Sequence, residues 1–355
     1  MNRPDAARVS TLPAEAGDAA PLAEVKIGLL GTGAIAQVVH LPTLGQMPGV
    51  GVAAVCDADP AKARAIGSRF EIPRVYRADD DLVRDPDLEG VIICTPSYLH
   101  EQQSIAALEA GKHVLVEKPL ALTADGARRV LTAAEASGRA VMVAMNNRYR
   151  PDCRAVRPFA TNGELGRVFY MRAGLLNRKV RTVRPTWRHR RATAGGGALM
   201  DLGVQVLDLC MWMLDYPRVN RLVAHLHPGE GIEVEDAAAV MAEIDGGLVL
   251  SLQVTWSLIA ERDRQYLQLL GTHGSASLVP LAVNKEIEHG VLDVTPQIPP
   301  GRANMYTASY RDQLAHFTGV IRGTDDAPLP TEQIQLMEFI SLAYRSGHER
   351  REIVA

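Results

Sequence analysis

A glycine-rich turn directly after an apolar run could bind a dinucleotide. The run Val25–Leu30 leads into a G-x-G-x-x-A sequence at residues 31–36. Gly31 would permit the tight turn, Gly33 would let the backbone approach a pyrophosphate, and Ala36 would permit close packing of a helix on the strand. The following helix N-terminus would present free N–H groups to the phosphates. A plain glycine turn is the alternative. The predicted cofactor contacts here are Gly31, Thr32, Gly33, Ala34 and Ile35.

A second apolar run, at 52–56, is followed by an acidic residue, Asp57. It lies about 26 residues beyond Gly31, near the spacing at which an acid meets the ribose hydroxyls of the adenosine. A carboxylate there would repel a 2′-phosphate, so NAD is predicted in preference to NADP. The alternative role is that of a helix cap for 58–70, which Asp59 fits better because it precedes Pro60.

Polar residues follow three further apolar runs, at 91–94, 114–116 and 140–144. The groups are Thr95-Pro96-Ser97, Glu117-Lys118-Pro119 and Asn146-Asn147-Arg148. In a parallel sheet, ligands lie beyond the carboxyl ends of the strands, so these groups should meet at one edge. We expect cofactor contacts from Thr95, Pro96, Ser97, His100, Glu117, Lys118 and Asn146, and a substrate contact from Arg148.

Two kinds of element must position these residues. Up to about residue 147, apolar runs without alternation are separated by amphipathic segments such as 98–110 and 124–136, which indicates a doubly wound parallel sheet. Later segments mix polar and apolar residues at strand spacing, which indicates a large open, mostly antiparallel sheet. These segments are 166–175, 237–244, 248–255 and 265–270.

The chain is therefore predicted to be an α/β protein with two domains. Residues 1–24 are expected to form a flexible tail, 25–147 a dinucleotide-binding Rossmann domain, and 148–355 a domain for substrate binding and oligomerisation. An apolar helix is predicted at 198–214, after a run of three glycines. A C-terminal helix near 333–344 could pack back on the first domain.

Composition narrows the functional classes. The 355 residues are 47% hydrophobic and 22% charged, with a net charge of −3, which favours neither nucleic acid nor an anionic membrane surface as a partner. No apolar run approaches the roughly 18 residues of a membrane helix. The four cysteines have neither zinc nor redox spacing, so no metal is predicted and reduced thiols in a cytoplasmic protein are expected.

Several motifs together resemble the glucose-fructose oxidoreductase/inositol dehydrogenase family, also called Gfo/Idh/MocA, over nearly the whole chain after the tail. They are T-P-S-Y-L-H at 95–100, A-G-K-H-V at 110–114, E-K-P-L-A at 117–121, Trp187-Arg188, G-G-G-A-L-M-D-L-G at 195–203, Glu235-Asp236 and G-T-H-G-S at 271–275. The resemblance implies a Rossmann domain, then an α/β domain with a large open sheet, and sheet-to-sheet association into a homodimer or homotetramer.

The resemblance also implies a reaction. Family members bind NAD or NADP and present a sugar, polyol or related alcohol to C4 of the nicotinamide. Lys118 matches the family's active-site lysine, whose peptide bond to the following proline is often cis. Trp187 and Arg188 are expected to contact the cofactor. A lysine at the surface end of a strand is the alternative interpretation of Lys118.

The sequence departs from the family in one motif, Asp-x-Gly-x-His. Asp201 and Gly203 match, but Gln205 occupies the histidine position, and a glutamine amide does not titrate. Asp201, Gln205 and Asp208 are spaced to share one helix face. Lys118 is then the best candidate for proton transfer, if burial lowers its pKa, or for stabilising an alkoxide. Asp201 would orient Lys118 or the substrate, and Gln205 would hold the substrate oxygen.

Basic residues are frequent between residues 177 and 194. They are Arg178, Lys179, Arg181, Arg184, Arg188, Arg190 and Arg191. One interpretation is a solvated loop. The other is a clamp for an anionic substrate, such as a nucleotide-linked sugar or a sugar acid, with contacts from Arg181 and Arg184.

Three functions are consistent with these features. The first is an NAD(P)-dependent dehydrogenase or ketoreductase acting on a CH–OH group of a small sugar, cyclitol or related alcohol. The second is a non-catalytic NAD-binding regulator, which Gln205 would permit. The third is an NAD-dependent glycosidase, which would oxidise its substrate transiently to permit elimination.

Overall fold

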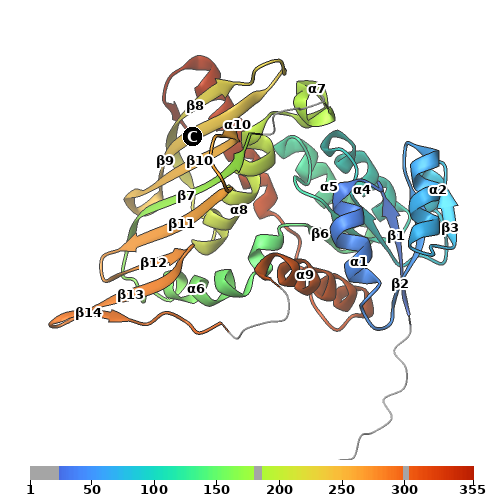
Figure 1. Ribbon diagram of the computed structural model, residues 1–355, viewed down its shortest axis with the longest axis horizontal. Helices are drawn as coiled ribbons and strands as arrows, with labels where there is room; N and C mark the ends of the chain where they lie inside the picture. Colours follow the sequence, from blue (N-terminus) through green and yellow to red (C-terminus); the bar gives the residue numbers. More distant parts are fainter. Residues whose placement is uncertain (1–23, 180–185, 299–303) are drawn as a thin grey trace, which may run out of the picture.

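The computed structural model describes residues 24–179, 186–298 and 304–355, and it contains two sheets that face a shared layer of helices (Figure 1). The tail expected at 1–24 lies outside the described residues except for Glu24. No helix in the described ranges is long and apolar enough to cross a membrane.

The first sheet has six parallel strands in the order β3-β2-β1-β4-β5-β6. The chain moves outward from β1 and then returns to its other side, which places a topological switch point between β1 and β4. This confirms the predicted doubly wound sheet and adds a short edge strand, β3. Its strands are β1 (Val25–Leu30), β2 (Val50–Cys56), β3 (Arg74–Tyr76), β4 (Gly90–Ile93), β5 (His113–Val116) and β6 (Val141–Val143).

Helices connect these strands because the intervening segments carry caps and one apolar face. Asp59 caps α2, and Thr123 caps α5 through a bond from Gly126 N. The helices of this part are α1 (Leu41–Leu44), α2 (Pro60–Arg69), α3 (Asp79–Val83), α4 (His100–Glu109) and α5 (Ala124–Ser137). A π-helical turn, Ala36–His40, follows the glycine-rich turn and runs into α1.

The second sheet has nine strands in the order β14-β13-β12-β11-β7-β10-β9-β8-β15. All of its pairings are antiparallel except that of β10 with β7, so the expected mostly antiparallel sheet is confirmed. The strands are β7 (Val168–Arg178), β8 (Val219–Pro228), β9 (Glu235–Ile244), β10 (Leu248–Leu258), β11 (Arg264–Gly271), β12 (Gly274–Leu278), β13 (Leu281–Ile287), β14 (Gly290–Asp293) and β15 (Ile353–Val354).

Helices cover one face of this large sheet and leave the other open (Figure 1). The pattern is visible along β9, where Val240 and Ala242 are buried while Ala239 and Met241 are exposed. Within the described ranges no helix lies on the exposed face. The covering helices are α6 (Pro151–Thr161), α8 (Val204–Met213) and α10 (Glu332–Glu349), and α8 is apolar almost all round because it is buried between the sheet and other helices.

The C-terminal part of the chain returns to the first domain. Helix α9 (Met305–Arg322), which was not predicted, inserts Leu314 and Phe317 into the core that contains Ile27 and Leu29. Helix α10 is longer than the predicted 333–344 and contacts both α5 and β8. The two sheets are therefore tied together by two helices that follow β14 in sequence.

Candidate active site

A cleft of about 680 Å³ lies at the carboxyl ends of the first sheet's strands, closed on its other side by the segment that leads into α8 and by the start of α9. This is the edge at which the sequence predicts the strand-end groups to meet. The predicted residues that line it are Gly31, Gly33, Ala34, Ile35, Asp57, Thr95, Pro96, Ser97, His100, Glu117, Lys118, Trp187, Arg188, Asp201 and Gln205.

The glycine-rich turn has the shape that a bound dinucleotide requires. Gly31 has φ of 87°, and a Cβ on it would lie 2.8 Å from the backbone of Cys94. A Cβ on Gly33, in contrast, would meet no atom within 4 Å. Gly31 is therefore needed for the close approach of two strand ends, whereas Gly33 leaves open space where a pyrophosphate would lie.

Asp57 is held firmly at the end of β2. Its Oδ2 accepts hydrogen bonds from Thr32 N (2.7 Å) and Thr32 Oγ1 (2.9 Å), and Lys62 Nζ lies 2.8 Å away. Burial alone would raise the pKa of Asp57, but these donors and the N–H of Asp59 outweigh it and lower the pKa. Thr32, which is predicted to contact the cofactor, thus orients the carboxylate of Asp57 and does not itself line the cleft. Asp59, not Asp57, caps α2.

An ion pair joins the two sides of the cleft. Lys118 Nζ donates to Oδ1 and to the backbone oxygen of Asp201, both at 2.8 Å. The side chains are 20% and 26% exposed, so the pair is partly screened yet open to a ligand. Burial acts to raise the pKa of Asp201, but Lys118, the charge of Arg188 and a hydrogen bond from Trp256 together lower it. The peptide bond between Lys118 and Pro119 is cis, as expected.

Asp201 and Gln205 come from one continuous helix whose first part, Leu199–Gly203, is a π-helical turn. Both line the cleft, but Asp208 does not. Its carboxylate is 1% exposed and accepts from Arg148 Nε at 2.8 Å. The spacing that places the three polar residues on one helix face therefore does not bring all three to the cleft, because Arg148 binds the last of them.

The predicted substrate contact from Arg148 is corrected in the same way. Its guanidinium also donates to Glu332 Oε1 (2.8 Å) and to the hydroxyl of Tyr216 (2.6 Å), and it does not line the cleft. Asn146 points away as well, since its amide nitrogen donates to Ser309 Oγ at 3.0 Å. The polar side chains of the turn after β6 therefore hydrogen-bond to α8, α9 and α10, and they are not available to a ligand in the cleft.

Two buried polar side chains support the strand-end loops. His100 Nδ1 lies 2.7 Å from the carbonyl oxygen of Pro119, and Nε2 lies 2.9 Å from that of Thr95, so the ring bridges two loops. Burial lowers the pKa of His100 despite these bonds. Glu117 Oε1 accepts from His40 Nε2 at 2.8 Å. Burial would raise the pKa of Glu117, but the hydrogen bond and charge of His40 lower it.

Some cleft residues gave no signal in the sequence. Tyr306 and Tyr310 reach it from the first turns of α9, and Leu175 and Asn177 from β7. The ring of Tyr310 packs edge-on against His40, with centroids 5.9 Å apart. These positions depend on how distant segments fold back, and no motif marks them.

The basic segment contributes only in part. Arg188 lines the cleft, with its guanidinium 4.4 Å from the centroid of the Trp187 ring. Arg178 instead binds Asp263, and the Arg191 side chain lies 3.2 Å from His348 Nε2. The two residues predicted to bind substrate, Arg181 and Arg184, lie outside the described residues.

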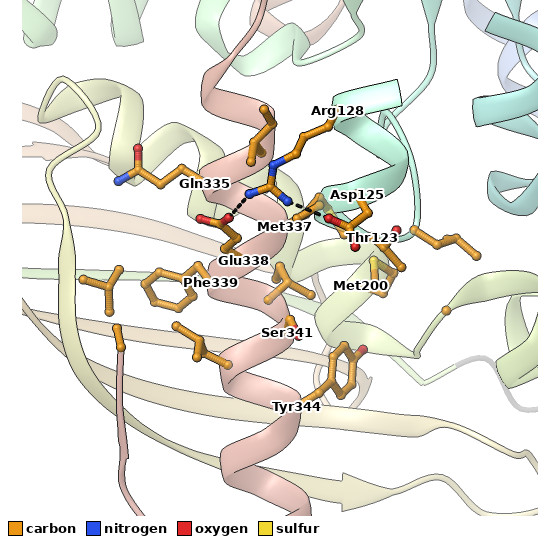
Figure 2. Close-up of a pocket in the computed structure, with 18 of the residues that line it drawn as sticks. Thr123, Asp125, Arg128, Met200, Gln335, Met337, Glu338, Phe339, Ser341 and Tyr344 are labelled. Carbon is orange, nitrogen blue, oxygen red and sulfur yellow. Dashed lines mark hydrogen bonds and ion pairs between the residues drawn. The ribbon is translucent and has the colours of Figure 1, made fainter. Parts of the chain in front are cut away.

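A second cavity, of about 1050 Å³, lies between α5 and α10. Figure 2 shows that Arg128 of α5 forms ion pairs with Asp125 of the same helix and with Glu338 of α10, and that Tyr344 lies further along α10. None of the predicted site residues that the structure describes lines this cavity. It borders the cleft through Met200, which lines both. We assign the chemistry to the smaller cleft because the dinucleotide turn and the ion pair meet there.

Comparison with known proteins agrees with this geometry. A model described as an oxidoreductase family with an NAD-binding Rossmann fold, GFO_IDH_MocA, matches residues 25–145, and the Gfo/Idh/MocA C-terminal domain matches 153–277. The chain belongs to the Gfo/Idh/MocA family. This oxidoreductase therefore has an NAD-binding Rossmann domain followed by the family's C-terminal domain.

Relatives of this family member are found at moderate identity. An uncharacterised oxidoreductase, ORF334, of Rhizobium meliloti is 32% identical, with 91% of this chain and 97% of the relative covered. Inositol 2-dehydrogenase of Paracoccus denitrificans is 30% identical, with 86% and 88% covered. The crystal structure of GenD2 from gentamicin A biosynthesis, in complex with NAD, has a TM-score of 0.81 at 25% identity and covers 98% of this chain and 99% of its own.

Proposed function

We propose that this family member is an NAD-dependent dehydrogenase acting on a secondary alcohol of a sugar, cyclitol or related compound, or on the corresponding ketone. The observation that carries the proposal is the contact of Lys118 with Asp201 beside the dinucleotide turn. The similarity to an inositol 2-dehydrogenase supports a polyhydroxylated substrate.

The first domain's residues fit the cofactor. Gly33 leaves open space at the helix start, and Asp57 Oδ1 accepts only the N–H of Asp59 among the described residues, so it has room for a ribose hydroxyl. When bound, NAD would accept or donate a hydride at C4 of its nicotinamide. The negative charge of Asp57 favours NAD over NADP, since a 2′-phosphate would face a carboxylate.

Lys118 is the residue proposed to handle the charge of the reacting oxygen. Its ammonium group has three N–H bonds, and Asp201 accepts two of them. The third can point to the substrate oxygen, where it stabilises an alkoxide or transfers a proton. Because a carboxylate holds the ammonium group in place, little rearrangement is needed when charge develops.

Gln205 has a different role in this proposal. Its amide can donate and accept hydrogen bonds but cannot exchange a proton near neutral pH. Situated on the same helix as Asp201, it would fix a substrate hydroxyl and leave the proton to Lys118. Arg188, exposed at the cleft, would attract an anionic substrate group if the substrate has one.

The test is to follow the absorbance of reduced nicotinamide while the protein and NAD are mixed with sugars, cyclitols and sugar acids. Net reduction that is lost in Lys118→Ala and retained in Lys285→Ala supports the proposal; Lys285 is a matched control because it pairs with Glu164, outside the cleft. Silence with every compound, despite tight NAD binding, would favour a regulator. Release of a glycoside's leaving group without net change in NAD would favour a glycosidase.

We further propose that copies associate through the open face of the nine-stranded sheet. Val223 and Met241 are direct cross-strand neighbours there, and they are 48% and 52% exposed. Exposed apolar pairs on an uncovered sheet are typical of an interface. Light scattering should give the mass of a dimer or tetramer, and Met241→Asp should reduce it; a monomeric parent protein at micromolar concentration would contradict this.

A further inference from the structure

The helix that carries Asp201 and Gln205 is capped by a residue far away in the sequence. The first N–H groups of a helix have no partner within the helix. Here Gly197 N and Leu199 N both donate to Glu235 Oε1, at 2.9 and 3.0 Å. Glu235 begins β9 and is 6% exposed. A buried carboxylate from the large sheet thus does what a local serine or aspartate does in most helices.

Tyr344 fixes the orientation of this carboxylate. Its hydroxyl donates to the same oxygen of Glu235 at 2.8 Å. Burial, and then the charge of Glu235, raise the pKa of Tyr344 far above its ordinary value, so the hydroxyl remains a donor. Figure 2 shows the ring extending from α10 along the second cavity. Three elements, β9, α10 and the start of the active-site helix, therefore meet at one oxygen atom.

The glycine run is shaped to this contact. A Cβ on Gly196 would lie 1.8 Å from the hydroxyl oxygen of Tyr344, and a Cβ on Gly197 would lie 1.8 Å from the backbone oxygen of Glu235. No side chain fits in either place. The two glycines let the start of the helix approach β9 closely enough for its backbone N–H groups to reach the carboxylate of Glu235.

The capped turn leads directly to the ion pair. Asp201 N donates to Gly197 O at 2.9 Å, so Asp201 lies one turn beyond a capped residue. A shift of Gly197 and Leu199 would move Asp201 relative to Lys118, which is anchored on the other domain. Glu235 itself does not line the cleft.

We propose that Glu235 is a positioning residue for the reaction: its carboxylate, oriented by Tyr344, holds the first turn of the active-site helix so that Asp201 meets Lys118. The inference rests on the proposed function, because it concerns the same ion pair. It goes beyond that function by assigning a catalytic consequence to a side chain that touches neither cofactor nor substrate.

The experiment compares Glu235→Gln, Glu235→Ala and Tyr344→Phe with Glu243→Gln, a control at the other end of β9 where the carboxylate pairs with Arg221 at the surface. Glu235→Ala should lower kcat by about tenfold or more, because small misplacements of reacting groups have large effects on rate. Glu235→Gln should recover part of the rate, since its amide oxygen accepts the same bonds. The NAD dissociation constant and KM should change less than kcat in both.

Two measurements keep the inference separate from the proposed function. Hydrogen exchange of the amides at 197–201 should quicken in Glu235→Ala and Tyr344→Phe, whether or not a substrate has been found. A parent protein that turns over no substrate would count against the proposed function, while unchanged exchange would overturn the inference. If Glu235→Ala does not fold, Glu235→Gln and Tyr344→Phe decide: wild-type kcat in both would also overturn it.

Discussion

The two sides of the cleft are built in different ways. On the cofactor side, the backbone dominates: Gly31 and Gly33 shape the turn, and Asp57 and His100 are fixed by bonds to neighbouring loops. On the side proposed to bind substrate, side chains dominate, and Lys118 and Asp201 form a contact 83 residues apart in sequence. The cofactor side should therefore be sensitive to added volume, and the substrate side to lost functional groups.

The largest expected effect comes from removing the ammonium group. Lys118→Ala should lower kcat by about 10²–10⁴, the usual contribution of a general acid–base group. The NAD dissociation constant should stay within about twofold of the parent value, because the dinucleotide turn is untouched. Steady-state kinetics and fluorescence titration measure the two quantities. If the variant turns over substrate as fast as the parent protein, another residue must transfer the proton.

The next effect separates two glycines of the turn. Gly31→Ala should lower the free energy of unfolding by roughly 1–3 kcal/mol, because its φ is positive and its Cβ would strike the Cys94 backbone. Gly33→Ala should leave the melting temperature of the protein alone unchanged, since its Cβ points into open space, yet weaken NAD binding. Tight NAD binding by Gly33→Ala would show that the pyrophosphate does not lie there.

A smaller effect concerns the choice of cofactor. Asp57→Ser removes the carboxylate and frees Lys62 Nζ, now 2.8 Å from it, to meet a 2′-phosphate. The ratio of NADP to NAD affinity should rise about tenfold, near 1.4 kcal/mol. Adding Lys62→Ala should reverse much of that rise. The measurement is both dissociation constants at one salt concentration; a parent protein that prefers NADP would refute the ribose role of Asp57.

The smallest effect is one of pH. A carboxyl group with a lowered pKa stabilises the folded protein above its unfolded pKa of about 3.9, and this contribution is lost as the pH falls through the lower folded value. Asp201 should therefore remain ionised between roughly pH 5 and 7 and add no inflection to the profile of kcat/KM. Gln205→His should add one near the ordinary histidine pKa of about 6.5. An unaltered pH profile of kcat/KM would mean that the side chain at position 205 does not contact the reacting groups.

This difference between the two sides also explains what the sequence could predict. Apart from Thr32, the residues predicted after β1, β2, β4 and β5 line the cleft, because parallel strands bring their carboxyl ends to one edge. Asn146 and Arg148 follow β6 at the same edge, but partners on later helices draw them away. Strand order says where a loop lies; it does not say which groups compete for its side chains.

The substrate side was predictable only where a motif existed. Lys118, Asp201 and Gln205 were predicted from the family's motifs and line the cleft, whereas helical spacing alone could not tell that Asp208 is bound by Arg148 away from it. Tyr306 and Tyr310 reach the cleft because α9 folds back, a tertiary event without a local signal. Glu235 belongs to a motif, but its bond to the helix start 36 residues away depends on how β9 packs against that helix, which no local pattern shows.

The return of α9 to the first sheet has a consequence for modularity. Leu314 and Phe317 are fully buried in the core that contains Ile27 and Ile92, although the matched Rossmann segment ends at residue 145. A fragment cut at that boundary would leave this core open to water. The nucleotide-binding domain can be exchanged between proteins only if α9 is exchanged together with it. A chimaera within this fold therefore needs a second crossover, before α9, in addition to the one near residue 145.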